Sequence, residues 1–212
     1  MAALDLQEQE QLDSLKAWWK ENGLKLLGAL LAVTLFFSGW RGWQYYQHRQ
    51  SSEAATLYAG FMKQLERNDP KRVNDAAAAV MEKYASASYA PRAALLAAQI
   101  NEQTKDAARA KTQLQWVIDH AGEPGLKDVA RLRLAAILLD EKNYTDAIKL
   151  LDVKHPASFD GLYADLRGDV LNAQGKMAEA KVAYQSAYDK TDAKSMYRNL
   201  IQMKMDAIGE IK

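Results

Sequence analysis

Cysteine is absent from the 212 residues, which excludes disulfides, thiol catalysis and cysteine-ligated metal sites and is compatible with an oxidising compartment. Only three histidines occur, His48, His120 and His155, and their separations do not match a metal-ligand spacing. We interpret them as surface residues. The sequence also lacks a glycine-rich phosphate loop, a nucleophile elbow and an HExxH zinc motif. We therefore expect a protein that is not an enzyme and has no cofactor and no metal.

An excess of either charge is also missing, because 28 Lys and Arg face 27 Asp and Glu. A nucleic-acid-binding protein needs a clustered basic face, so we expect no nucleic-acid partner. Asp165 and Asp169 lie one helical turn apart and could pair their carboxylates for acid–base chemistry. Since no nucleophile or metal ligand is nearby in the sequence, we interpret the pair as a solvated acidic face.

One stretch lacks charge altogether: no Asp, Glu, Lys or Arg occurs between Leu26 and Trp40. Tryptophan pairs bracket this stretch, and the distance from Trp19 to Trp40 is roughly 31 Å of helix, about the thickness of the hydrocarbon core. Indole rings favour the membrane interface. The sequence therefore predicts a transmembrane helix over residues 24–46 after a cytoplasmic tail of residues 1–23. The expected interface anchors are Trp18, Trp19, Lys25, Trp40, Arg41 and Trp43.

Two other interpretations of this stretch are less favoured. A cleaved signal peptide has a short basic lead and small residues before the cut, whereas this lead is 23 residues long and the run ends in bulky aromatics. A buried core helix leaves the tryptophan pairs unexplained. Three lysines at or before the span against two arginines after it give a weak bias toward a cytoplasmic amino terminus.

Small residues recur within the apolar stretch at a spacing that lets two helices approach closely. They define a candidate face for packing against a partner helix: Gly28, Ala32, Ser38 and Gly42. No proline precedes Pro70, so we expect the helix to continue to about Arg67.

Strand patterns are absent too, and the rest of the chain has the period of helix after helix. Three of the four prolines, Pro91, Pro124 and Pro156, lie 33 and 32 residues apart, a period typical of two-helix solenoid repeats. We predict an all-α protein with a single amino-terminal transmembrane helix and a tetratricopeptide-like repeat domain over residues 47–212. The small and large residues of the repeats align well for the second and third pairs of helices. They align for the first pair if its turn, around Lys105 to Ala110, has one extra residue.

The repeats predict two further features. The last helix, residues 195–208, is expected to cover the end of the stack through one apolar stripe, Met196, Leu200, Met203 and Ala207. The first helix of each repeat lines the concave face, where residues 126–139 form a helix that is apolar nearly all round. Either both faces of this helix are buried or one lines an apolar groove. The candidate groove residues are Val129, Leu132, Ala136, Leu139, Leu162, Asp165 and Asp169.

Four blocks of sequence resemble the YfgM family of ancillary SecYEG translocon subunits. They are Glu21-Asn22-Gly23, Gly39-Trp40-Arg41-Gly42-Trp43, Ala164 to Asp169, and Met203-Lys204-Met205. The resemblance implies a single-pass protein of a bacterial inner membrane, with its amino terminus in the cytoplasm and its repeat domain in the periplasm. It also implies three partners: the SecYEG translocon, the membrane-anchored periplasmic chaperone PpiD, and nascent secreted proteins.

The favoured function is therefore a membrane-anchored ancillary subunit of the translocon, which assists the handover of secreted proteins to periplasmic chaperones by protein–protein binding. One alternative is a regulator whose amino-terminal tail sequesters a cytosolic signalling protein. Another is a structural scaffold of the cell envelope that is unrelated to secretion. Deletion of residues 1–15 separates the first two functions, because it abolishes regulation and spares export.

Overall fold

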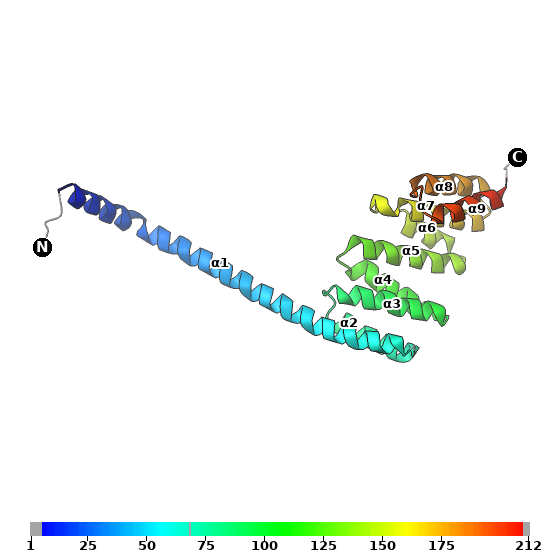
Figure 1. Cartoon of the computed structure of the whole chain (residues 1–212), viewed down its shortest axis with the longest axis horizontal. Coiled ribbons are helices and arrows are strands. Elements are labelled where there is room, and N and C mark those ends of the chain that lie inside the picture. Colours follow the sequence, from blue (N-terminus) through cyan, green and yellow to red (C-terminus); the bar gives the residue numbers. More distant parts are fainter. Residues whose placement is uncertain (1–5, 68, 210–212) are drawn as a thin grey trace. The chain divides into compact units, whose positions relative to one another are not determined.

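A computed structural model describes residues 6–67 and 69–209, and every regular element in these ranges is a helix (Figure 1). The chain divides into two compact units, Met1–Gln50 and Ser51–Lys212, and each is described by itself. The helices are α1 (Leu6–Glu66), α2 (Pro70–Lys83), α3 (Tyr89–Gln103), α4 (Ala107–His120), α5 (Pro124–Asp140), α6 (Tyr144–Leu151), α7 (Asp160–Ala173), α8 (Met177–Lys190) and α9 (Tyr197–Ile208), with the 3₁₀ turn η1 (Ala157–Phe159) before α7. The predicted all-α class is confirmed.

Helix α1 runs without interruption into the repeat domain, as the lack of early proline predicts. Its last part belongs to the second unit, because Ala54 and Phe61 are fully buried there. Asp69 then starts α2, since its carboxylate accepts hydrogen bonds from the backbone N–H groups of Lys71 and Arg72. Pro70 occupies the first turn of α2, where a missing N–H group costs nothing.

Three helix pairs, α3–α4, α5–α6 and α7–α8, are joined by turns of the same length and hydrogen-bond pattern. In each turn the central residue has a positive φ: Lys105, Lys142 and Gly175. The next residue donates its N–H to a carbonyl five positions earlier, at 2.8 to 2.9 Å. We call α3, α5, α7 and α9 the inner helices, and α2, α4, α6 and α8 the outer helices, following the order of a tetratricopeptide stack.

The expected extra residue in the first turn is wrong, because all three turns have three residues. Counting back from these turns, Ala98 rather than Ala97 corresponds to Ala135 and Gly168. Ala98 and Ala135 are fully buried. At Gly168 an added Cβ atom would lie 2.5 Å from the Tyr184 ring of the outer partner α8.

The core consists of successive clusters, each shared by neighbouring helices. Helix α5 contributes to two of them. Ala130 and Leu134 pack toward α3 and α4, and Ala135 packs toward α6 and α7 together with the half-buried Leu132 and Leu139. Both of these faces are therefore buried, while Val129 of the same helix is 37% exposed.

A closed ring of three amides crosses the core between α2, α3 and α4. Asn74 and Asn101 exchange two hydrogen bonds of 2.8 Å, and Gln113 bonds to both at 2.7 and 2.8 Å. All three side chains are buried. Because a buried amide without a partner is costly, the ring fixes the register of these three helices.

Helix α9 covers the end of the stack, but not through the predicted stripe. It packs on α7 and α8 through Tyr197, Ile201, Met205 and Ile208, whereas Met196, Leu200 and Met203 are 86%, 44% and 66% exposed and Ala207 is also exposed. The helix has two apolar sides, and helical period alone does not tell which one faces the core. The hydrogen bond that Tyr197 donates to α7 selects the buried side.

Candidate interaction surfaces

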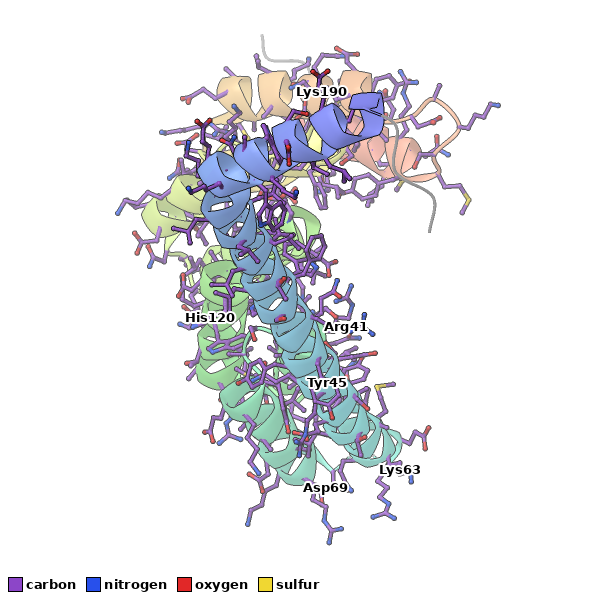
Figure 2. The ribbon with its side chains drawn as sticks, turned by 90° about the vertical axis from the view of Figure 1, so that its left-hand side faces the viewer. Arg41, Tyr45, Lys63, Asp69, His120 and Lys190 are labelled. Carbon is purple, nitrogen blue, oxygen red and sulfur yellow. The ribbon has the colours of Figure 1, made fainter. Side chains whose placement is uncertain are left out.

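Among the described residues, one helix is long and apolar enough to cross a membrane, the part of α1 from Glu10 to Glu66. Its apolar side chains are almost wholly uncovered within the first unit, and the four tryptophans of the predicted anchors are about half exposed. Lys25 and Arg41 are exposed as well. Figure 2 shows Arg41 and Tyr45 standing out from the ribbon of α1. An uncovered apolar surface of this length fits a lipid environment.

The small residues of α1 also face open space within this chain. A Cβ atom added at Gly28 or Gly42 meets nothing within 4 Å, and Ala32 and Ser38 are exposed. Gly23 differs, since the Trp19 ring lies 3.2 Å from such an added atom. The four small residues are thus free to contact another helix, and the packing role remains a prediction.

The candidate groove residues do not form one surface. Leu132, Ala136 and Leu139 are half-buried, and the two leucines pack against the cluster shared by α5, α6 and α7. Val129 and Leu162 are exposed at 37% and 40%. The remaining two, Asp165 and Asp169, lie side by side on α7 and contact α9. Binding by these seven residues remains a prediction.

The acidic pair on α7 is not a solvated face, because Asp165 is only 2% exposed. Lys204 of α9 places its Nζ between the two carboxylates, 2.7 Å from Asp165 Oδ2 and 2.8 Å from Asp169 Oδ2. Tyr197 donates to Asp165 at 2.5 Å, and Tyr184 donates to Asp169 at 2.8 Å. Lys204 lies in the Met203-Lys204-Met205 block, but nothing in the sequence predicts its contact with the two aspartates of α7.

The pKa values are shifted for Tyr184, Tyr197 and Lys204, which contact Asp165 or Asp169, and for Tyr163, which contacts Asp128. Burial, followed by a hydrogen bond to an aspartate, raises the pKa of Tyr163, Tyr184 and Tyr197. Burial opposes the charge on Lys204, but its hydrogen bonds to the two carboxylates outweigh burial, so the pKa of this lysine is raised above 10.5. The folded state therefore keeps these groups protonated.

A tyrosine-to-aspartate hydrogen bond links consecutive inner helices twice. Tyr163 of α7 donates to Asp128 of α5 at 2.8 Å, as Tyr197 of α9 donates to Asp165 of α7. Both aspartates are buried. Leu162 directly precedes Tyr163 on α7, and Met196 directly precedes Tyr197, the first residue of α9. Val129 and Leu162 correspond, because each lies twelve residues before its turn.

Five apolar side chains on or beside the inner helices are exposed: Val129 of α5, Leu162 of α7, Met196 directly before α9, and Leu200 and Met203 of α9. Two charged residues close to them in the sequence are paired within the chain, Arg133 with Glu102 at 3.0 Å and Lys204 with Asp169 at 2.8 Å.

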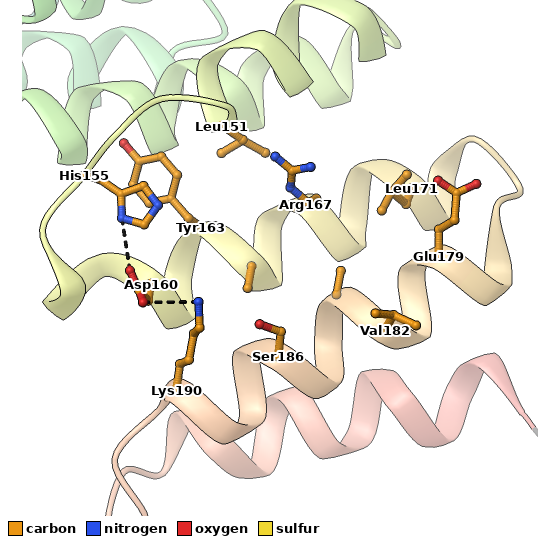
Figure 3. A pocket seen from close by; sticks show the side chains of 12 residues that line it. Leu151, His155, Asp160, Tyr163, Arg167, Leu171, Glu179, Val182, Ser186 and Lys190 are labelled. Atoms are coloured by element: carbon orange, nitrogen blue, oxygen red, sulfur yellow. Dashed lines mark ion pairs between the residues drawn. The ribbon is translucent and has the colours of Figure 1, made fainter.

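A hollow of about 300 Å³ lies between α7 and α8 (Figure 3). Helix α6 has 8 residues, whereas α4 and α8 have 14 each, so α7 and α8 are left uncovered beyond the end of α6. Asp160 at the rim lies 3.3 Å from the His155 ring and 3.2 Å from Lys190 Nζ. The hollow thus combines an apolar floor with a paired, charged rim.

The histidines have different surroundings. His155 is not a surface residue, because its ring stacks on Tyr163 at 3.9 Å and its side chain is only 17% exposed. His120 is exposed and stacks on Trp116, and the side chain of His48 lies outside the described residues. Within the described ranges, no three His, Asp or Glu side chains come together as metal ligands.

Comparisons with known proteins cover nearly the whole chain. A family model for a tetratricopeptide repeat-like domain matches residues 16–210. The ancillary SecYEG translocon subunit of Neisseria gonorrhoeae (strain ATCC 700825 / FA 1090) is 31% identical over 210 residues, which are 97% of this chain and 99% of that protein. The protein of the same name in Escherichia coli (strain K12) is 28% identical over 206 residues, 95% of this chain and 97% of that one.

A solved structure shares the fold. MamA from Desulfovibrio magneticus RS-1 (41 to the end) superposes with a TM-score of 0.50 over 74% of this chain and 90% of its own, at 19% identity. This likeness concerns the fold alone. The sequence similarity, in contrast, extends over both the apolar helix and the repeat domain.

Proposed function

Because the chain belongs to the family of ancillary SecYEG translocon subunits, which share its tetratricopeptide repeat-like domain, we propose that it associates with SecYEG in a bacterial inner membrane. The observation that carries the proposal is the extent of the similarity, 97% of this chain at 31% identity. The uncovered apolar part of α1 supports a membrane anchor at the amino terminus.

In this proposal the amino terminus lies in the cytoplasm and the repeat domain in the periplasm. The lysines at and before the apolar stretch favour this orientation. The repeat domain then receives secreted proteins as they emerge and assists their handover to periplasmic chaperones, with PpiD as a partner. The exposed apolar side chains of Val129, Leu162 and Leu200 on its inner helices are candidates for contact with such proteins.

Topology is tested with reporters fused after Lys212. We expect a periplasm-active reporter to be active and a cytoplasm-active reporter to be silent. The reverse pattern overturns the proposed orientation and, with it, handover in the periplasm.

Association with SecYEG is tested by co-purification of the tagged full chain from membranes. Replacement of Gly28 and Ala32 by Leu keeps the span apolar but adds bulk that blocks close helix approach. We expect this double variant to insert normally and to recover less SecYEG than the wild-type chain. The matched control replaces Leu27 and Leu31 by Ile, which leaves both hydrophobicity and bulk nearly unchanged. Absence of SecYEG from the wild-type preparation contradicts the proposed function.

A further inference from the structure

We propose that residues 10–22 of α1 form an amphipathic helix that lies along the lipid surface, on the amino-terminal side of the membrane span. The inference rests on the proposed function only because it requires that the apolar part of α1 crosses a membrane. The partner of this segment is the headgroup layer of the bilayer, so the contact needs neither SecYEG nor a second copy of the chain.

Three apolar side chains share one face of this segment. Leu12, Leu15 and Trp19 lie at i, i+3 and i+7, which brings them onto one side of an α-helix. Their exposed fractions are 42%, 60% and 52%. The opposite side carries polar and small residues: Glu10, Asp13, Ser14, Ala17 and Glu21. Since all side chains in residues 10–21 are exposed, no part of the described chain covers the apolar face.

The position of this face in the chain identifies what covers it. Trp19 is one of the expected interface anchors, and the uncharged stretch follows at Leu26. The headgroup layer on each side of the hydrocarbon core is roughly 5–8 Å thick. Leu12 precedes Trp19 by a distance of roughly 10 Å along a helix. A helix that continued straight out of the bilayer would therefore leave Leu12 in water, whereas a helix along the surface keeps the whole face at headgroup depth.

Helix α1 changes direction before the span, as a surface helix requires. Figure 1 and Figure 2 both show the amino-terminal end of α1 (dark blue) running in a different direction from the part that follows. The side-chain amide of Asn22 donates to the Trp18 carbonyl at 3.2 Å, the same carbonyl that accepts the backbone N–H of Asn22 in a regular helix. Gly23 has no Cβ atom, and the Trp19 ring packs 3.2 Å from where that atom would be. These two contacts place the bend at residues 18–23.

The charges of the segment indicate an apolar contact rather than an ionic one. Two lysines and three acidic residues lie between Glu10 and Glu21, and Lys16 pairs with Asp13 at 3.0 Å. The segment thus has no excess positive charge that would require anionic lipid. Lys16 and Lys20 can extend their ammonium groups toward water and lipid phosphates while their stems stay at the surface. Binding to zwitterionic lipid is therefore expected.

Spin labels test the depth of individual side chains. Because the chain has no cysteine, one introduced cysteine is its only labelling site. The full chain is placed at one copy per nanodisc of zwitterionic lipid, and collisions of the label with oxygen and with a water-soluble nickel chelate are compared. We expect Leu12→Cys and Leu15→Cys labels to favour oxygen, which concentrates in lipid, and Asp13→Cys and Ala17→Cys labels to favour the chelate. A Leu31→Cys label reports on the span.

The labels separate this inference from the proposed function. Equal accessibility on the two sides of the segment, with the Leu31→Cys label in lipid, overturns the surface helix and leaves the membrane anchor intact. A Leu31→Cys label in water overturns both. Since the nanodiscs contain no SecYEG, neither result depends on the co-purification test.

Hydrogen exchange measures the same contact without a label. Leu12→Gln with Leu15→Gln removes the apolar face and keeps charge and helix propensity nearly unchanged. The matched control, Ser14→Gln with Ala17→Gln, places two glutamines on the opposite side. Because short unsupported helices are marginal in water, we expect amides of residues 10–17 to exchange about tenfold or more faster in the first variant and to change less than about twofold in the control. Equal effects of both variants, or no effect of the first, overturn the proposal.

Discussion

Replacement of Lys204 by Met tests how α9 is held on the repeat domain. The substitution keeps the length and apolar stem of the side chain and removes the one charge that contacts both Asp165 and Asp169. Asp165 then remains buried with only the Tyr197 hydroxyl as a hydrogen-bond donor to Oδ2, and its Oδ1 has no partner to begin with. A buried carboxylate is thus left without its counter-charge.

The expected cost follows from the burial of the two partners. Breaking a buried ion pair costs about 3–5 kcal/mol, whereas an exposed pair contributes about 0–1 kcal/mol. Asp165 has 3% of its side chain exposed and Lys204 has 25%, so the pair belongs near the lower end of the buried range. We expect Lys204→Met to lower the free energy of unfolding by about 3 kcal/mol.

The assay is urea unfolding of the full chain in detergent, followed by circular dichroism, with hydrogen exchange of α9 as the local measurement. A double-mutant cycle with Asp165→Asn separates the charge from packing, because the neutral amide no longer needs a counter-charge. We expect the double variant to recover about 1 kcal/mol or more relative to the sum of the single variants. A loss below about 1 kcal/mol for Lys204→Met, or additive single effects, refutes the reasoning.

Three other predictions concern the core. Gly168→Ala forces a methyl group against the buried Tyr184 ring and should lower the stability by about 1–3 kcal/mol in a thermal melt. The control is Gly125→Ala, whose new methyl group has its nearest contacts at 3.9 Å and should not lower the stability. Asn101→Leu removes the donor to the buried Gln113 Oε1, whereas Asn74 keeps its bonds to Pro70 and Gln113, so the variant should lose about 1–3 kcal/mol by urea unfolding. A neutral result contradicts the role assigned to the ring. Tyr163, Tyr184 and Tyr197 have raised pKa values, so the unfolded state loses those protons first and stability should fall as the pH rises above 10.0. Tyrosinate absorbance should therefore rise for these three only as the protein unfolds at alkaline pH, and their titration in the folded state near pH 10 contradicts this prediction.

Long-range patterns made the architecture predictable. The tryptophan pairs and the uncharged run between them identify the apolar helix, and the absence of proline before Pro70 predicts how far α1 extends. The period of the later prolines identifies a repeat. These patterns can be detected in a single sequence. Each depends either on many residues together or on proline, which is excluded from the interior of most helices.

The register of the first repeat was not predictable, for a local reason. Glycine marks the turn with positive φ only at Gly175, while Lys105 and Lys142 adopt the same backbone without any such signal. Ala97 and Ala98 are also adjacent and identical in type, so composition does not distinguish which of them meets the outer helix. The turn is set by tertiary packing in two of the three repeats, and packing is not visible in the sequence.

Two predictions about which residues are exposed were wrong, both where two helices meet. An aspartate is usually solvated, so its type does not predict that Asp165 is buried. Its ion pair with Lys204, 39 positions later in the sequence, compensates for the burial. In the same way, the exposed stripe of Met196, Leu200 and Met203 has the period of a core stripe. The hydrogen bond from Tyr197 to Asp165 of α7 places the other side of α9 against the core. Contacts between helices that are far apart in the sequence determine which residues are buried. Helical period describes one helix at a time and does not predict these contacts.

The division of the core into successive clusters has a consequence for dynamics. Each helix of the repeat domain packs on neighbours one or two places along the chain, so the free energy of opening is distributed over local units rather than over one global core. Contacts close in sequence favour rapid folding. The carboxy-terminal unit, α8 with α9, has neighbours on one side only and should show the fastest amide exchange of the stack. Sub-global opening there releases α9, which carries the exposed side chains of Leu200 and Met203.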